Sequence, residues 1–280
     1  MTFPFKRALN ASTLFPFALD LPQQIETAAQ AGYEGIEIWM RDLEAYVAAG
    51  GSLAMLRARI ADTGLTVANA IAFFAWADAD AEVRARGMVQ AEREMHMLAE
   101  LGCAAVAAPP FGNVAGVPLE SIAEAYALLA ALGRRIGVEP YLEFWGRAAR
   151  LSRLSEALYV ALESGVTNAQ LLLDPFHMYT GGSDVSGIGY LAGHAIGIVH
   201  VNDYPATPAR EVITDAERVF PGEGIAPSRR LARLLYDTGY RGFLSLELFI
   251  GDYGGATALE VARRGIDAMQ RAYTIGGVAE

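Results

Sequence analysis

Four residues of types that bind metal ions or transfer protons occur where apolar runs end in the second half of the chain. They are Glu143 in YLEFWG, Asp174 in QLLLDP, His200 in IVHVND and Glu247 in LSLELF. Charged side chains are rarely buried unless they are paired or bind a metal. Three carboxylates gathered at one place would repel one another, and a divalent cation relieves that repulsion. Because oxygen ligands with one imidazole suit Mn²⁺, Mg²⁺, Co²⁺ or Zn²⁺, we predict one divalent metal ion as the cofactor.

Each of these residues also has an ordinary structural interpretation when it is taken alone. Asp174 precedes Pro175 and could cap a loop. A lone histidine such as His200 is more often structural than a ligand, and Glu247 could be a strand-end carboxylate that is already hydrogen-bonded. The metal hypothesis therefore depends on the recurrence of such groups at corresponding ends of successive predicted strands.

Other residues near the same strand ends are candidates for contact with a substrate. His177 follows Asp174 by one helical turn, which suits contact with a bound ligand, although it could also be a solvated loop residue. Trp145 and Asn69 also lie near predicted strand ends and are candidates for substrate binding. Further candidates for lining a pocket are Glu37, Trp39, Phe73, Phe74 and Asp203.

Short β-rich runs alternate with longer amphipathic helical runs along the whole chain. Eight runs read as strands, at residues 8–12, 35–39, 66–73, 104–109, 139–144, 170–174, 197–203 and 243–248. Eight strand–helix units in 280 residues predict an α/β fold, a single (β/α)₈ TIM barrel with one domain over residues 1–280. A doubly wound sheet is the alternative, but neither a GxGxxG nor a GxxxxGK[ST] motif occurs. In a barrel, residues 203–227 form the loop after strand seven, on the face where active sites lie.

Composition and charge exclude several classes of protein. The net charge is −10, from 32 acidic and 22 basic residues, whereas nucleic-acid binders usually carry the opposite sign. The N-terminus lacks the apolar core of a signal peptide, and no apolar run is long enough to span a membrane. The expected location is cytoplasmic, and the expected partner is a small molecule, with a homo-oligomer possible. Cys103, the single cysteine, is expected to be buried.

The motifs around these residues resemble those of the xylose-isomerase-like TIM-barrel superfamily of sugar isomerases and epimerases. The resemblance rests on LEFWG, LLLDPFHMY, VHVND, RVFPGEG and LSLELF, and it extends over essentially the whole chain. Within the superfamily the sequence is most similar to 2-keto-myo-inositol (inosose) isomerase, through ANAIAFF, DPFHMYTGGSD and ITDAERVFPGEG. Endonuclease IV shares the fold but resembles this chain less.

The resemblance implies a role for each matching residue. A single divalent metal is expected on Glu143, Asp174, His200 and Glu247, with the two glutamates also acting as acid and base. His177 matches a substrate-contacting histidine. Arg218 matches a substrate-contacting arginine, although Arg210 in the same loop is an alternative. The further glutamate that the related ketose 3-epimerases carry after the strand-five ligand has no match in EFWGRAAR, which counts against that activity.

These expectations predict a metal-dependent isomerase or epimerase of sugars or keto-cyclitols. One glutamate removes the proton beside a ketone, a metal-bound enediolate forms, and the other glutamate returns a proton. The alternative is a metal-dependent dehydratase for an inosose or a dehydroshikimate-type substrate, since both reactions begin with the same proton abstraction. A non-catalytic sugar-binding barrel is a third hypothesis, which needs no acid–base pair.

Overall fold

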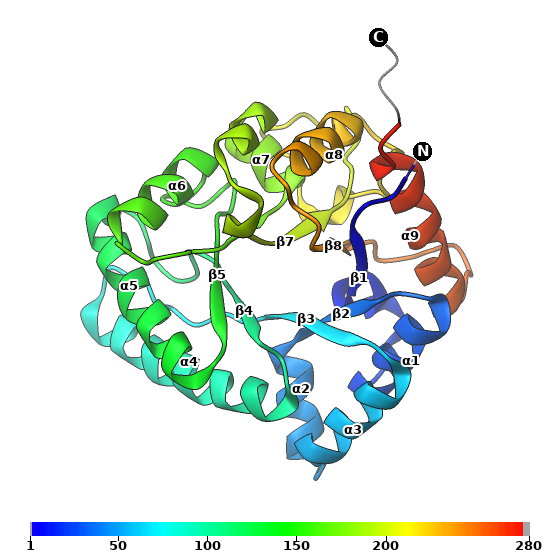
Figure 1. Cartoon of the computed structure of the whole chain (residues 1–280), viewed down its shortest axis with the longest axis horizontal. Coiled ribbons are helices and arrows are strands. Elements are labelled where there is room, and N and C mark those ends of the chain that lie inside the picture. The colour runs from blue at the N-terminus through cyan, green and yellow to red at the C-terminus, as the bar shows by residue number, and fades with distance from the viewer. Residues whose placement is uncertain (1, 277–280) are drawn as a thin grey trace.

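The computed structural model describes residues 2–276 and confirms the predicted (β/α)₈ barrel. All strand pairs are parallel, in the order β3-β2-β1-β8-β7-β6-β5-β4. Figure 1 shows the strands in the centre, with the helices as an outer ring. Among the described residues, β3 and β4 are the neighbouring strands without a shared ladder. The strands are β1 (Lys6–Asn10), β2 (Gly35–Trp39), β3 (Thr66–Ile71), β4 (Ala105–Ala108), β5 (Glu139–Glu143), β6 (Leu171–Leu173), β7 (Ile196–Val201) and β8 (Phe243–Leu246).

At least one helix follows each strand and covers the barrel. Side-chain caps fix several helix starts: Asp20 accepts a hydrogen bond from the Gln23 amide at α1, and Thr257 forms a capping box with Glu260 at α9. Gly102 ends α4 in a left-handed conformation, with φ of 91°. The helices are α1 (Leu21–Ala31), α2 (Met40–Ala48), α3 (Leu53–Thr63), α4 (Ala81–Leu101), α5 (Leu119–Ile136), α6 (Leu154–Glu163), α7 (Pro175–Gly181), α8 (Ser228–Asp237) and α9 (Ala258–Tyr273).

Side-chain alternation along the strands separates two layers. One set of strand residues packs under the helices and forms the large apolar core, which includes the buried Cys103. The other set faces the barrel axis, where Leu172 and Ile198 belong to a smaller apolar cluster. The side chains that face the axis near the carboxyl ends of β5, β7 and β8 are polar. They place carboxylates and an imidazole at one mouth of the barrel.

The first strand begins and ends earlier than residues 8–12, where the sequence places it. β1 spans Lys6–Asn10, and a 3₁₀ helix follows at Ala11–Phe17 because the Asn10 side chain accepts a hydrogen bond from the Ser12 amide. Within this 3₁₀ helix, the Thr13 hydroxyl donates a hydrogen bond to the Leu246 carbonyl at the end of β8. In the described part of the chain, no helix has both the length and the apolar composition needed to cross a membrane.

Candidate active site

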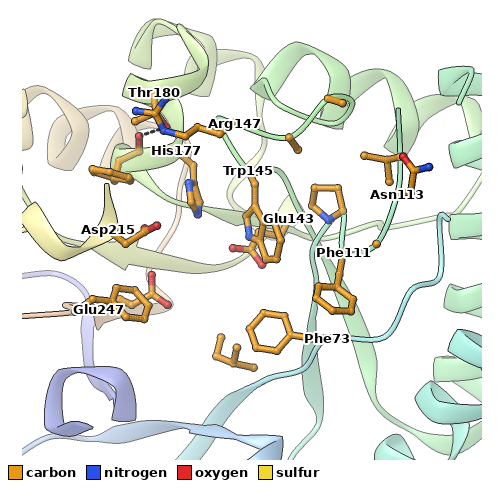
Figure 2. A pocket seen from close by; sticks show the side chains of 18 of the residues that line it. Phe73, Phe111, Asn113, Glu143, Trp145, Arg147, His177, Thr180, Asp215 and Glu247 are labelled. Atoms are coloured by element: carbon orange, nitrogen blue, oxygen red, sulfur yellow. Dashed lines mark hydrogen bonds between the residues drawn. The ribbon is translucent and has the colours of Figure 1, made fainter. Parts of the chain in front are cut away.

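The predicted ligands lie at the carboxyl ends of four consecutive strands. Glu143 is the last residue of β5, Asp174 follows β6, His200 lies near the end of β7, and Glu247 follows β8. All four are buried, each with no more than 5% of its surface exposed. Figure 2 shows Glu143 and Glu247 facing the same pocket from different sides.

Three of the four residues form a compact group. Candidate ligand atoms of Asp174, His200 and Glu247 lie within 4.8 Å of one another. His200 Nδ1 is 3.1 Å from Glu247 Oε2 and 3.6 Å from Asp174 Oδ2. Glu143 does not belong to this group, although it lines the adjoining pocket.

Asp174 uses its two carboxylate oxygens for different contacts. Its Oδ1 accepts hydrogen bonds from the Phe176 amide at 2.7 Å and from Asn202 Nδ2 at 3.1 Å, so it caps α7. Its Oδ2 remains directed at the group, 2.7 Å from Arg218 Nη1. One carboxylate oxygen therefore caps the helix that carries His177, while the other faces His200 and Arg218.

Arg218 is the cation that balances these carboxylates. Its Nη1 lies 2.7 Å from both Asp174 Oδ2 and Glu247 Oε2, and its Nε donates to Asp215 at 2.9 Å. The side chain is 1% exposed, and the guanidinium lies over the Phe176 ring at 4.6 Å. Arg210, the alternative arginine, is exposed and pairs with Glu211.

Burial and neighbouring charges shift the pKa values of the group in different directions. Burial, partly offset by His200, raises the pKa of Glu143 to about 8, with the Glu247 and Asp174 carboxylates adding to the shift. Burial also raises the pKa of Glu247, although His200 and Arg218 oppose it. Both carboxyls that face the cavity therefore hold a proton more tightly than a free glutamate side chain does.

The two histidines of the site, His200 and His177, have pKa values that are shifted in opposite directions. Burial would lower the pKa of His200, but the Glu247 and Glu37 carboxylates outweigh it and raise that pKa well above its usual value. Burial lowers the pKa of His177 to about 4, even though Asp174 opposes the shift. Burial would raise the pKa of Asp174, yet Arg218 and the histidines hold it well below its usual value.

A cavity of about 730 Å³ opens beside this group. One wall is aromatic, with the Phe73 ring 5.4 Å from Trp39, 5.5 Å from Phe111 and 6.0 Å from Trp145. The other wall is polar and contains His177, Asp215, Arg218 and Glu247. Figure 2 shows His177 and Asp215 on the side of Glu247, across from Phe73 and Phe111. The cavity thus has an apolar face and a hydrogen-bonding face.

The structure brings most of the residues predicted to bind substrate to this cavity. His177, Trp145 and Arg218 line it, but Asn69 is fully buried and donates a hydrogen bond to Glu37 behind the cavity wall. Of the further candidates, Trp39 and Phe73 line it too. Phe74, fully buried, belongs to the main apolar core, and Asp203 accepts hydrogen bonds from loop amides. Sequence reasoning did not single out Phe111, Arg147, Phe176, Asp215 and Phe249, which lie in loops, in α7 or, for Asp215, at the start of a short 3₁₀ helix.

Arg147 is one of these unexpected residues, and it connects two loops at the rim. Its guanidinium donates hydrogen bonds to the backbone carbonyls of Arg210, Glu211 and Ile213 at 2.8, 2.9 and 2.5 Å. These carbonyls belong to the segment after β7, which precedes Asp215 and Arg218. The loop after β5 therefore supports the segment that carries Asp215 and Arg218.

The donor set fits a divalent cation. His200 Nδ1 is buried and makes no hydrogen bond with any described residue, although two carboxylate oxygens lie close to it. Carboxylate oxygens and an imidazole nitrogen are ordinary ligands for Mn²⁺, Zn²⁺ and related ions. Metal binding would compete with the proton that the raised pKa of His200 favours.

Comparison with known proteins agrees with this geometry. A family described as xylose isomerase-like TIM barrel matches residues 25–272. The chain belongs to this family. The superfamily resemblance in the sequence motifs is thereby confirmed, and proteins with two different activities are among the relatives.

Two curated relatives in this family represent those activities. A 3-dehydroshikimate dehydratase of Pseudomonas aeruginosa is 32% identical over 237 residues, which cover 82% of this chain and 36% of that protein. An inosose isomerase of Bacillus velezensis is 28% identical over 252 residues, which cover 87% of this chain and 89% of that protein. The chain spans little more than a third of the length of the dehydratase.

A solved structure supports the fold assignment. The IOLI protein, crystallised with a zinc atom, superposes with a TM-score of 0.87 at 24% identity, covering 96% of this chain and 98% of that one. The two chains therefore share their fold over almost their full lengths.

Proposed function

We propose that the protein is a divalent-metal-dependent isomerase or epimerase of keto-sugars or keto-cyclitols, similar to inosose isomerase. The observation that carries the proposal is the pair of carboxylates, Glu143 and Glu247, that face one cavity beside the Asp174–His200–Glu247 group. The inosose isomerase relative and the zinc-holding structural neighbour support it. We further propose that Glu143 completes the metal-binding set.

Each residue has a defined task in this reaction. Glu247 removes the proton from the carbon beside the ketone, and Glu143 returns a proton to the neighbouring carbon or to the opposite face of the same carbon. The two roles exchange in the reverse direction. His177 and Arg218 hydrogen-bond the substrate oxygens on which negative charge develops. When bound, the metal polarises the ketone and makes the adjacent proton more acidic.

The pocket walls supply the remaining requirements. The aromatic rings of Trp39, Phe73 and Trp145 cover one face of a six-membered ring and exclude water from it. Asp215 holds Arg218 in place through the contact with Nε. The substrate oxygens then face the polar wall, where the acid and the base lie.

The test is incubation of the metal-loaded protein with a panel of ketoses and inososes in D₂O, followed by NMR. We expect deuterium to enter at the carbon beside the ketone of at least one keto-cyclitol, together with an isomerised product. Binding of these compounds without any exchange would exclude the isomerase and favour a sugar-binding barrel.

A dehydratase is the second candidate, because the relative with 32% identity over 82% of this chain is a 3-dehydroshikimate dehydratase. The same proton abstraction would be followed by loss of the β-hydroxyl, which leaves as water with a proton from the acid carboxyl. A conjugated product that absorbs in the ultraviolet distinguishes this reaction from isomerisation.

A further inference from the structure

Glu37 is a buried carboxylate behind the candidate metal centre that the proposed reaction does not use. It is fully buried in β2, and its two oxygens accept four hydrogen bonds. The donors are Asn69 Nδ2 at 2.7 Å, Ser245 Oγ at 2.6 Å, Asn10 Nδ2 at 3.1 Å and His200 Nε2 at 3.1 Å. Burying a carboxylate is costly unless its oxygens accept a full set of hydrogen bonds. The buried position of Glu37 therefore depends on these four donors.

The backbone is adjusted to bring these partners together. Ile36 pairs with Val67, whereas Glu37 pairs with Asn69, so β3 has one additional residue between the two pairs. Bulges of this kind redirect side chains, often next to active sites. If the register continued without this shift, Ala68 would lie opposite Glu37, and the side-chain amide of Asn69 would not face the Glu37 carboxylate.

The orientation of Asn10 follows from its own neighbours. Its Oδ1 accepts hydrogen bonds from Trp39 Nε1 at 2.9 Å and from the Ser12 amide at 3.0 Å, both of which can only donate. Its Nδ2 therefore donates, at 3.1 Å to Glu37 Oε2 and at 3.1 Å to Glu247 Oε1. One amide group thus connects Glu37 with Glu247.

The same reasoning fixes the imidazole of His200. An ionised carboxylate only accepts hydrogen bonds, so the nitrogen that faces Glu37 must carry a hydrogen. That nitrogen is Nε2, which leaves Nδ1 directed toward Asp174 and Glu247. Carboxylates that hold a ligating histidine in this way commonly set its tautomer and its ring orientation.

We propose that Glu37 is a positioning residue of the metal centre, which holds His200 with Nε2–H toward itself and with Nδ1 free to bind the metal. The inference rests on the metal site of the proposed function and adds a residue that acts through His200 without contacting the substrate. Asn10 also connects the Glu37 carboxylate to Glu247. The side chains of His200 and Glu247 are therefore both held in place through Glu37.

The first experiment uses the wild-type protein and needs no substrate. The chain has four histidines, so a ¹⁵N-histidine spectrum of the zinc-loaded protein is simple, and a His200→Gln variant assigns the His200 signals. We expect the Nε2 signal of His200 to be that of a protonated nitrogen and the Nδ1 signal to be that of a zinc-bound nitrogen. The opposite pattern, with zinc on Nε2, would overturn the inference.

The second experiment measures the affinity for Zn²⁺ and Mn²⁺ by competition with a chelator. Glu37→Gln is expected to weaken binding of both metals about 10- to 100-fold, whereas Ser245→Ala, which removes another donor to the same carboxylate, changes it by less than about threefold. Equal affinity of Glu37→Gln and wild type would overturn the inference. A wild-type protein that binds neither metal would instead overturn the proposed function, and if Glu37→Gln does not fold, the wild-type spectrum still decides.

Discussion

At the scale of single residues, Glu247 has the most demanding position, because it contacts the imidazole, the guanidinium and Asn10 and also lines the cavity. Replacement by glutamine keeps the shape but removes the base. We predict that Glu247→Gln slows solvent-deuterium exchange beside the ketone by at least about 100-fold. The rate is read by NMR, with Glu163→Gln, an exposed change on α6, as the control. Exchange at the wild-type rate would remove Glu247 from catalysis.

Arg218 provides a prediction about stability. Its guanidinium is buried between Asp174 and Glu247, so removing it leaves two carboxylates without their cation. In buffer containing EDTA, Arg218→Met should lower the free energy of unfolding by about 3–5 kcal/mol. Arg233→Met, which removes an exposed partner of Asp237, should cost less than about 1 kcal/mol. Denaturant titration measures both, and similar losses for the two variants would contradict the role given to Arg218.

At the scale of elements, the loop after β5 packs unusually closely against α7. A β-carbon at Gly146 would lie 2.1 Å from Thr180 Oγ1 and 2.5 Å from the carbonyl oxygen of His177. Only glycine therefore allows this approach, which holds the helix that carries His177. Thr180, which makes this contact, also lines the cavity, so the close packing helps to set one of its sides.

The matching prediction concerns Gly146→Ala. The added methyl must push the loop and α7 apart, which should lower the free energy of unfolding by about 1–3 kcal/mol and reduce kcat/KM, because His177 moves. Gly189→Ala is the control, since a β-carbon there meets nothing within 4 Å. Thermal unfolding and steady-state kinetics check the result; an unchanged kcat/KM would show that His177 does not depend on this contact.

The strands are the part of the structure that the sequence predicts best. Each of the eight strands lies within two residues of a predicted run, because parallel strands buried on both faces are continuous apolar segments. The start of β1 was less clear, since Lys6 and Arg7 look like surface residues, while Asn10 turns the chain through a side-chain cap. Asp174, His200 and Glu247 were visible because each interrupts such a segment.

Other parts of the site could not be predicted from one sequence. Asn10 and Glu247 are 237 residues apart, and nothing in either local pattern indicates that they share a hydrogen bond. The role of Asn69 depends on a one-residue shift between β2 and β3. Phe111 and Phe249 lie in loops, where the spacing of residues carries no periodic signal.

At the scale of the whole molecule, the centre connects strands from both halves of the chain. β2 contributes Glu37 and β1 contributes Asn10, while the proposed metal ligands lie at the carboxyl ends of β5 to β8. A cation bound at the proposed site would therefore stabilise contacts across most of the barrel, because it would bind the folded chain in preference to the unfolded one.

We predict that divalent metal raises the unfolding temperature. At a free concentration of 100 times Kd, Mn²⁺ or Zn²⁺ should stabilise the protein by about 2.7 kcal/mol, which corresponds to about 5 °C for a chain of this size. The comparison is made by calorimetry against EDTA and against KCl of equal ionic strength. An unfolding temperature that does not respond to either metal would contradict the metal centre.

The placement of the tryptophans has a practical consequence. Two of the three, Trp39 and Trp145, lie on the aromatic wall, whereas Trp76 is fully buried and donates to the Pro109 carbonyl. Intrinsic fluorescence of the unlabelled chain therefore reports directly on what enters the cavity. A titration that quenches or shifts the emission of two indoles against a constant third can rank ligands before any product has been identified.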